Sequence, residues 1–271
     1  MSEKKRILYV TQEMDPFVVI SQMAKISREL PLHVQNQGTE IRILMPKYGT
    51  INERRHRLHE VVRLSGINII IDDDDYPLII KVASIPGARM QVYFLDNDDF
   101  FERKGVFGDE KEPFFKDNPE RMIFFCKGVI ETVKKFGWPP DIIHLHGWMT
   151  SLLPLYIRTA YKNEPVFQNS KIIYSVYHNS FKEKLSENFL KKAAQIQRII
   201  KQENLEQYKD ADNEGLNMGA ISFSDAVIIG DTEVNGSVRE LLDTIKKPVL
   251  ELNDSKNYLE DYINFYNSVL S

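Results

Sequence analysis

The chain has 271 residues, of which 42% are hydrophobic and 27% charged, and its formal net charge is -4. This balance is that of an ordinary soluble protein and gives no reason to expect a nucleic acid or an acidic membrane as partner. No stretch reaches the ~20 apolar residues of a membrane span, and Ile7–Val10 is too short for the apolar region of a signal peptide. We therefore expect a cytoplasmic protein, folded as one large α/β domain over residues 1–271.

The N-terminal part predicts a βαβ unit. Ile7–Thr11 is a continuous apolar run, typical of a strand buried on both faces of a parallel sheet. Apolar residues at helical spacing follow from Gln22 to Val34, where Pro31 predicts a kink or an early end. Ile41–Pro46 is the second predicted strand, and parallel strands need such a crossover helix.

Between residues 58 and 96 the pattern changes to short β runs separated by turn signals. The runs are Val61–Leu64, Ile67–Ile71, Leu78–Ala83 and Met90–Leu95. They predict an antiparallel meander inserted into the sheet, with the last run a candidate to return to the parallel part.

Two charged clusters in this region allow two interpretations each. Asp72–Asp75 is either a cation site or a solvated hairpin turn, and adjacent carboxylates that point apart without a glycine-spaced calcium loop favour the turn. The arginines of Asn52–Arg57 either grip a phosphate or form a solvated surface turn, which nearby glutamates favour.

Asn97–Asn118 is predicted to be a long surface loop bordering a site. Pro119 then begins a helix that ends near Gly137. Cys126 is the only cysteine and lies in an apolar run of this helix, which indicates a small buried hydrophobe rather than a nucleophile.

The stretch Pro139–Thr150 predicts a buried strand, a tight turn and the start of a helix. Ligands of open parallel sheets bind outside the carboxyl ends of the strands, so His144, His146 and Trp148 lie where a site is expected. The two histidines are spaced i, i+2 and face the same side, but no third ligand has conventional spacing. We expect structural or ligand-contacting histidines and no metal, and a tryptophan that either stacks on a ligand ring or anchors the turn.

The rest of the chain continues the βα alternation. The predicted elements are a helix over Thr150–Tyr161, a strand over Lys171–Tyr177, a helical region over Ser186–Tyr208, a helix over Asn217–Phe223, a strand over Ala226–Gly230, a helix over Thr232–Leu242 and an amphipathic helix over Ser255–Leu270. The last helix is expected to pack back on the domain. His178 and Asn179 follow the end of a predicted strand, where a polar residue is either an ordinary loop residue or a functional one.

Five segments in this order resemble the N-terminal half of bacterial glycogen synthases and plant starch synthases, which transfer glucose from ADP-glucose to a growing α-1,4-glucan. The segments are Ile7–Phe17 for the family's first strand and S-E-x-x-P-F loop, Ile41–Tyr48 for R-V-x-x-P-x-Y, Val92–Gly108 for F-I-D-N and Y-F-x-R-x-G-x-Y-G, Asp141–Pro154 for D-V-V-H-x-H-D-W-x-x-x-L-x-P, and Ile172–Asn179 for V-x-T-I-H-N. The resemblance implies a single Rossmann-like domain with a mostly parallel sheet, as in the N-terminal half of a GT-B glycosyltransferase, carrying the meander as an insertion.

The match breaks at positions that touch the sugar nucleotide in the family. The K-T-G-G-L loop, whose glycine amides and lysine approach the phosphates, corresponds here to Val18–Met23, which contains neither glycine nor lysine. Gly147 replaces the aspartate of H-D-W, which the resemblance assigns to a hydrogen bond with glucose. We also expect the family's second nucleotide-binding domain to be absent, together with the cations that stabilise the departing diphosphate.

The resemblance implies an ADP-glucose-dependent α-1,4-glucan glucosyltransferase, and the departures predict a pseudoenzyme, a glycogen/starch synthase-like domain of glucan metabolism without independent catalysis. Its ligand-binding candidates are His146, Trp148, His178 and Asn179, with His178 the one catalytic candidate and no cofactor or metal expected. The expected partners are a glucan or sugar and a second subunit or second copy that completes the cleft, which the helix over Ser255–Leu270 would otherwise cover in part.

The alternative is a structural or regulatory interaction protein that uses the fold without a sugar ligand. Apolar packing at Val18–Met23 would favour this alternative, whereas an open cleft beside His178 would favour sugar binding.

Overall fold

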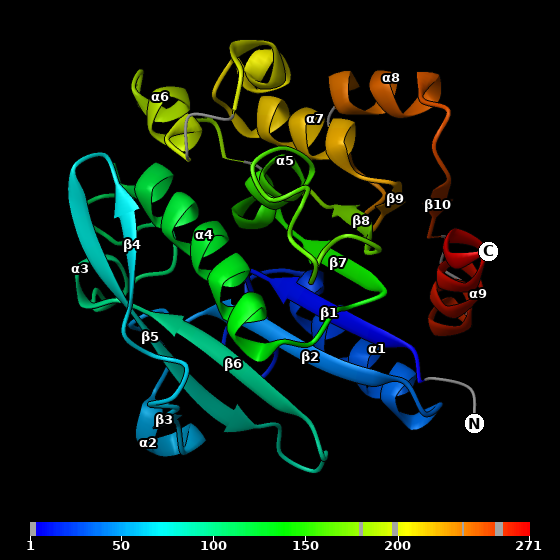
Figure 1. Cartoon of the computed structure of the whole chain (residues 1–271), viewed down its shortest axis with the longest axis horizontal. Coiled ribbons are helices and arrows are strands. Elements are labelled where there is room, and N and C mark those ends of the chain that lie inside the picture. Colours follow the sequence, from blue (N-terminus) through cyan, green and yellow to red (C-terminus); the bar gives the residue numbers. More distant parts are fainter. Residues whose placement is uncertain (1–3, 179–180, 197–199, 235, 253–256) are drawn as a thin grey trace.

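The computed structural model describes residues 4–178, 181–196, 200–234, 236–252 and 257–271. Within these ranges ten strands form one twisted, mostly parallel sheet with helices on both faces (Figure 1). The strands are β1 (Arg6–Thr11), β2 (Glu40–Pro46), β3 (His59–Glu60), β4 (Ile67–Ile71), β5 (Asp74–Ser84), β6 (Gln91–Asp96), β7 (Ile142–His146), β8 (Lys171–Val176), β9 (Ala226–Ile229) and β10 (Val249–Glu251). Their order across the sheet is β10-β9-β8-β7-β1-β2-β6-β5-β3, and β4 pairs with β5.

The α-helices are α1 (Gln22–Asn36), α2 (Glu53–His56), α3 (Asp98–Phe101), α4 (Asn118–Phe136), α5 (Leu152–Arg158), α6 (Phe189–Ala194), α7 (Asn213–Phe223), α8 (Gly236–Thr244) and α9 (Tyr258–Leu270). Two 3-10 helices, η1 (Trp148–Thr150) and η2 (Gln202–Tyr208), complete the described elements. Helices α4, α5 and α7 cover one face of the sheet, and α1 with α9 covers the other (Figure 1). None of the described helices is long and apolar enough to cross a membrane.

The central strands are buried because they are sandwiched between these helix layers. Every residue of β7 is buried, and β7 lies between β1 and β8 in parallel register. The parallel α/β sheet predicted from the continuous apolar runs is therefore confirmed. Cys126 is fully buried in α4, and burial raises the pKa of its thiol, as expected for a core residue.

The predicted meander is present with one error. β5 is antiparallel to β6 and to β4, whereas β6 returns to the parallel sheet beside β2. The expected strand Val61–Leu64 is wrong: only His59–Glu60 pairs with β5, and the next residues form a turn in which Leu64 N–H donates to the Val61 carbonyl. Val62 is 77% exposed, so its β-favouring side chain has no pleated surface to pack on.

The two charged clusters are solvated turns. Asp72 adopts a positive φ of 58° in the turn between β4 and β5, and the four aspartates Asp72–Asp75 are exposed. In the arginine cluster, α2 is a single helical turn with no buried residue. Its Glu53 carboxylate pairs with the Lys47 and Lys81 ammonium groups.

Several predicted boundaries shift. α1 passes through Pro31 and ends at Asn36, so the expected early end is wrong; its buried face packs on β1 and β2 and outweighs the hydrogen bond that proline removes. The helix predicted over Thr150–Tyr161 is confined to α5 because η1 occupies its first turn. The helical region Ser186–Tyr208 contains α6 and η2 as separate elements.

The segment Asn97–Asn118 is not a plain surface loop, because it contains α3 and buries Phe100, Phe101 and Phe115. The buried Arg121 guanidinium organises it from α4: its N–H groups donate to the carbonyls of Phe100 and Val106 and to the Asn118 side chain. Burial lowers the pKa of Arg121 to about 10.

Helix α9 lies beside α1 near the N-terminal end of the chain (Figure 1). Tyr262 and Tyr266 are its buried residues, and they face the sheet. On the outer side, Tyr258 donates to the Glu29 carboxylate and Glu260 lies 2.9 Å from His33 Nε2. The last helix thus closes the α1 face of the sheet.

Candidate functional site

The two histidines of β7 are built into the core. Their rings face the same side, as predicted, with centroids 3.9 Å apart. His144 Nδ1 lies 2.7 Å from the Tyr266 hydroxyl and its Nε2 lies 2.7 Å from Ser175 Oγ. His146 Nδ1 lies 2.8 Å from the Tyr177 hydroxyl, and its buried Nε2 has no hydrogen-bond partner among the described residues.

Burial governs the protonation of both rings. It lowers the pKa of His146 to about 3, and burial together with the neighbouring His146 holds the pKa of His144 well below its ordinary value. Both imidazoles are therefore neutral near pH 7. Neither residue lines a pocket described below, and no group of three or more metal-ligating side chains occurs within the described ranges.

The turn after β7 depends on Gly147. Its φ of 85° and ψ of 165° lie in a region that only glycine adopts without strain. A Cβ on this residue would lie 2.4 Å from both Cδ and Oε1 of Gln12, the residue that follows β1. The side chain of Gln12 therefore occupies the space beside Gly147, and its Oε1 accepts a hydrogen bond from the Met149 backbone N–H at 3.2 Å.

Trp148 is buried against a group of phenylalanines beside this turn. Its ring centroid lies 4.8 Å from that of Phe107 and 4.9 Å from that of Phe181, and Phe181 stacks on Phe114 at 4.8 Å. This wall borders a cavity of about 390 Å³, here called the aromatic pocket. Its lining residues are Gln12, Glu13, Ile20, Phe107, Pro113, Phe114, Trp148, Phe181, Lys182 and Glu183.

The loop between β1 and α1 is held by Glu13. One carboxylate oxygen accepts from the backbone N–H groups of Ile20 and Ser21, at 2.7 and 2.9 Å, and the other accepts from Ser21 Oγ at 2.6 Å. Glu13 is fully buried, and through these hydrogen bonds its carboxylate engages the backbone N–H groups that precede α1. At the tip of this loop Val19 and Ile20 are 66% and 53% exposed.

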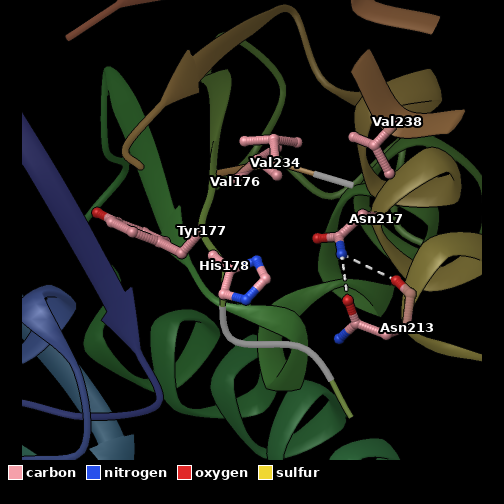
Figure 2. Close-up of a pocket in the computed structure, with 7 residues that line it drawn as sticks. All are labelled: Val176, Tyr177, His178, Asn213, Asn217, Val234 and Val238. Atoms are coloured by element: carbon pink, nitrogen blue, oxygen red, sulfur yellow. Dashed lines mark hydrogen bonds between the residues drawn. The ribbon is translucent and has the colours of Figure 1, made fainter. Parts of the chain in front are cut away.

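His178 lies in a separate, smaller cavity of about 60 Å³. Figure 2 shows its imidazole on the side of the cavity that faces Asn213 and Asn217, two residues of α7. The Asn217 amide donates to the Asn213 carbonyl and side-chain oxygens, and the buried Asn213 Nδ2 has no partner among the described residues. Asn179 lies outside the described residues.

The structure thus separates the candidates that the sequence placed together. Trp148 lines the aromatic pocket, His178 lines the small cavity, and His146 is sealed in the core. The expectations for these residues as ligand contacts stay predictions. Sequence analysis did not single out Gln12 or Phe181; the one available signal was the position of Gln12 directly after a buried strand, where sites of parallel sheets lie.

An α/β domain with polar and aromatic side chains gathered beyond its parallel strands has the architecture of one half of a GT-B glycosyltransferase. More specifically, residues 6–235 match the family model of the starch synthase catalytic domain, and the chain belongs to this family.

Similar proteins agree with this assignment. A glycogen synthase of Chlorobium limicola is 43% identical over 179 residues, and one of Chlorobaculum tepidum is 41% identical over the same length. In both cases the match covers 66% of this chain and 36% of the relative, so the matched part corresponds to little more than a third of these proteins. The catalytic domain of starch synthase IV from Arabidopsis thaliana, solved with ADP and acarbose, has the same fold with a TM-score of 0.69 at 19% identity, covering 98% of this chain and 50% of that one.

Proposed function

We propose that this glycogen/starch synthase-like domain binds an α-1,4-glucan in the aromatic pocket. The observation that carries the proposal is the wall of Phe114, Trp148 and Phe181 around a cavity of about 390 Å³ at the end of β7. Small-molecule sites in proteins occupy ~300–1,000 Å³ and combine aromatic walls with a few polar groups. The apolar faces of glucose rings suit such a wall, and their hydroxyls suit the polar rim.

The charges around the pocket support a neutral ligand. The Glu13 carboxylate is already satisfied by three hydrogen bonds from the loop before α1. Lys182 and Glu183 at the rim are exposed and of opposite sign, so they provide no net positive field. A diphosphate would need such a field, whereas a maltooligosaccharide would not.

The loop between β1 and α1 supports our proposal that the domain does not transfer glucose independently. Backbone amides at the start of a helix are a ready anion site, but those of Ile20 and Ser21 are taken by Glu13. The stretch Val18–Met23, which corresponds to the K-T-G-G-L loop of the family, contains no lysine and provides no positive charge. If transfer occurs, we expect ADP-glucose to be held mainly by groups that another protein domain contributes.

A second candidate function is favoured by the stretch Val18–Met23, in which Val18 and Met23 pack into the core while the adjacent side chains of Val19 and Ile20 are exposed. Neighbouring apolar residues that face solvent at the edge of a cleft are typical of a contact with another protein. They support the alternative of a structural or regulatory interaction protein. The cavity beside His178, at about 60 Å³, is smaller than the usual range for a sugar site and does not support ligand binding there.

Calorimetric titration with maltoheptaose and, separately, with ADP-glucose tests the proposal. We expect maltoheptaose to bind the native chain, Phe181→Ala to weaken binding about tenfold or more through loss of aromatic contact, and Val62→Ala, at an exposed position away from both cavities, to leave it unchanged as the control. Tight binding of ADP-glucose would contradict the inferred loss of the phosphate site. No response to either ligand from a folded chain would shift the function to protein interaction.

A further inference from the structure

Gln12 is a buried amide with one end unused. Its side chain is 1% exposed and lies between the end of β1 and the turn at Gly147. Backbone pairing sets this position, because Gln12 N–H donates to the His146 carbonyl at 3.4 Å. The residue therefore belongs to the junction of β1 and β7, where the aromatic pocket opens.

The hydrogen bond from Met149 defines which way the amide points. A backbone N–H can donate only to the oxygen of a carboxamide, so Oε1 faces Met149 and Nε2 is at the other end. Nε2 makes no hydrogen bond with any residue in the described part of the chain, and Gln12 lines the aromatic pocket. The Nε2 amino group is therefore free to donate a hydrogen bond to a molecule bound in the pocket.

Gly147 makes this placement possible. Any side chain at residue 147 would begin 2.4 Å from Cδ and Oε1 of Gln12 and would displace the amide. Gln12 and Gly147, which are far apart in the sequence, therefore act as one unit. The aspartate that the family motif has at residue 147 would supply a hydrogen-bond acceptor in this volume, whereas Gln12 supplies a donor.

We propose that Gln12 is a specificity-determining residue of the aromatic pocket, whose Nε2 donates a hydrogen bond to a hydroxyl oxygen of a bound neutral sugar. The inference rests on the proposed glucan function and adds the polar contact that orients the sugar against the wall of Phe114 and Phe181. A hydroxyl fits better than a carboxylate or phosphate, because the fully buried Glu13 carboxylate lines the same pocket.

The test compares maltoheptaose binding to the native chain, Gln12→Glu, Phe181→Ala and Gln168→Glu. Gln12→Glu keeps the shape and the oxygen that accepts from Met149, but it replaces the free donor with an acceptor, so affinity should fall about tenfold or more. Gln168→Glu introduces the same charge at an exposed glutamine and should leave affinity unchanged.

The outcomes separate the two proposals. If Phe181→Ala weakens binding while Gln12→Glu binds as the native chain does, the role of Gln12 is overturned and the glucan function stands. If the native chain does not bind maltoheptaose, both are overturned.

A direct readout covers the case in which Gln12→Glu does not fold. The side-chain amide protons of Gln12, assigned by their absence in Gln12→Ser, should shift in the NMR spectrum on adding maltoheptaose to the native chain. Unchanged Gln12 resonances at saturating ligand would also overturn the proposal.

Discussion

The hydroxyl of Tyr266, near the end of the chain, lies 2.7 Å from Nδ1 of His144 in the middle of β7. This contact joins the last helix to the centre of the sheet, and both residues are buried.

Removing this hydroxyl should destabilise the domain. Tyr266→Phe leaves a buried imidazole nitrogen without its partner, so we expect the free energy of unfolding to fall by about 1–3 kcal/mol in urea denaturation. Tyr258→Phe is the control, because its hydroxyl bonds the half-exposed Glu29 and water can replace it. An equal decrease in the free energy of unfolding in the two variants would show that the contact with His144 does not stabilise the domain more than the exposed contact does.

The buried histidines predict a loss of stability in acid. The pKa of His146 is about 3 in the folded state, below its ordinary value, so from about pH 6.5 downward the unfolded chain binds a proton that the folded chain does not. The free energy of unfolding should then fall by up to about 1.4 kcal/mol per pH unit for this residue.

Urea unfolding at several pH values between about 4.5 and 7.5 measures this slope. His146→Asn should reduce it by the equivalent of one proton, whereas Gln168→Asn, at an exposed position, should not change it. A slope that stays the same in His146→Asn would refute the prediction.

The turn at Gly147 predicts a coupled pair of substitutions. Gly147→Ala adds both a disfavoured φ and a clash with Gln12, whereas Gly87→Ala, also at positive φ, has open space around the new Cβ. We expect Gly147→Ala to cost about 1 kcal/mol more in unfolding free energy than Gly87→Ala. In a Gln12→Ala background, the difference in unfolding free energy between Gly147→Ala and Gly87→Ala should become smaller. An unchanged difference would show that the clash with Gln12 is not its cause.

Glu13 should control the start of α1. Glu13→Ala removes the carboxylate that accepts from Ile20 and Ser21, and it should lower the free energy of unfolding by about 1–3 kcal/mol. Hydrogen exchange at these two amides should accelerate in the variant. Glu60→Ala, at an exposed position, should affect neither quantity, and normal protection of the two amides in Glu13→Ala would contradict their assigned partner.

Most of the fold could be predicted because each central element has a local signal. β7 and β8 are apolar runs between turn residues. Helix α4 has Pro119 in its first turn and ends at Phe136, just before Gly137, whose φ of 57° suits a helix terminus. Val61–Leu64 was mispredicted because strand propensity depends on a partner surface, and α1 outlasted Pro31 because burial of its inner face outweighs one lost hydrogen bond.

The candidate site was predictable only in outline. Trp148 follows a buried strand and was expected at the carboxyl edge, where the structure places it. The neighbouring His146, only two residues away, points instead into the core toward Tyr177. Periodicity places a residue on one side of a sheet, but it does not show whether that side is open or covered by a helix such as α9.

The sequence by itself determined the order of the central strands and helices along the chain, the parallel core and the family, because these depend on local patterns and on motifs in a fixed order. Only the tertiary structure decided that Gln12 fills the space beside Gly147, that Glu13 occupies the amides before α1, and that two separate cavities lie beyond the strands. The physical reason is that hydrogen bonding and steric exclusion act between neighbours in space. Those neighbours become defined only once β1 and β7 pair.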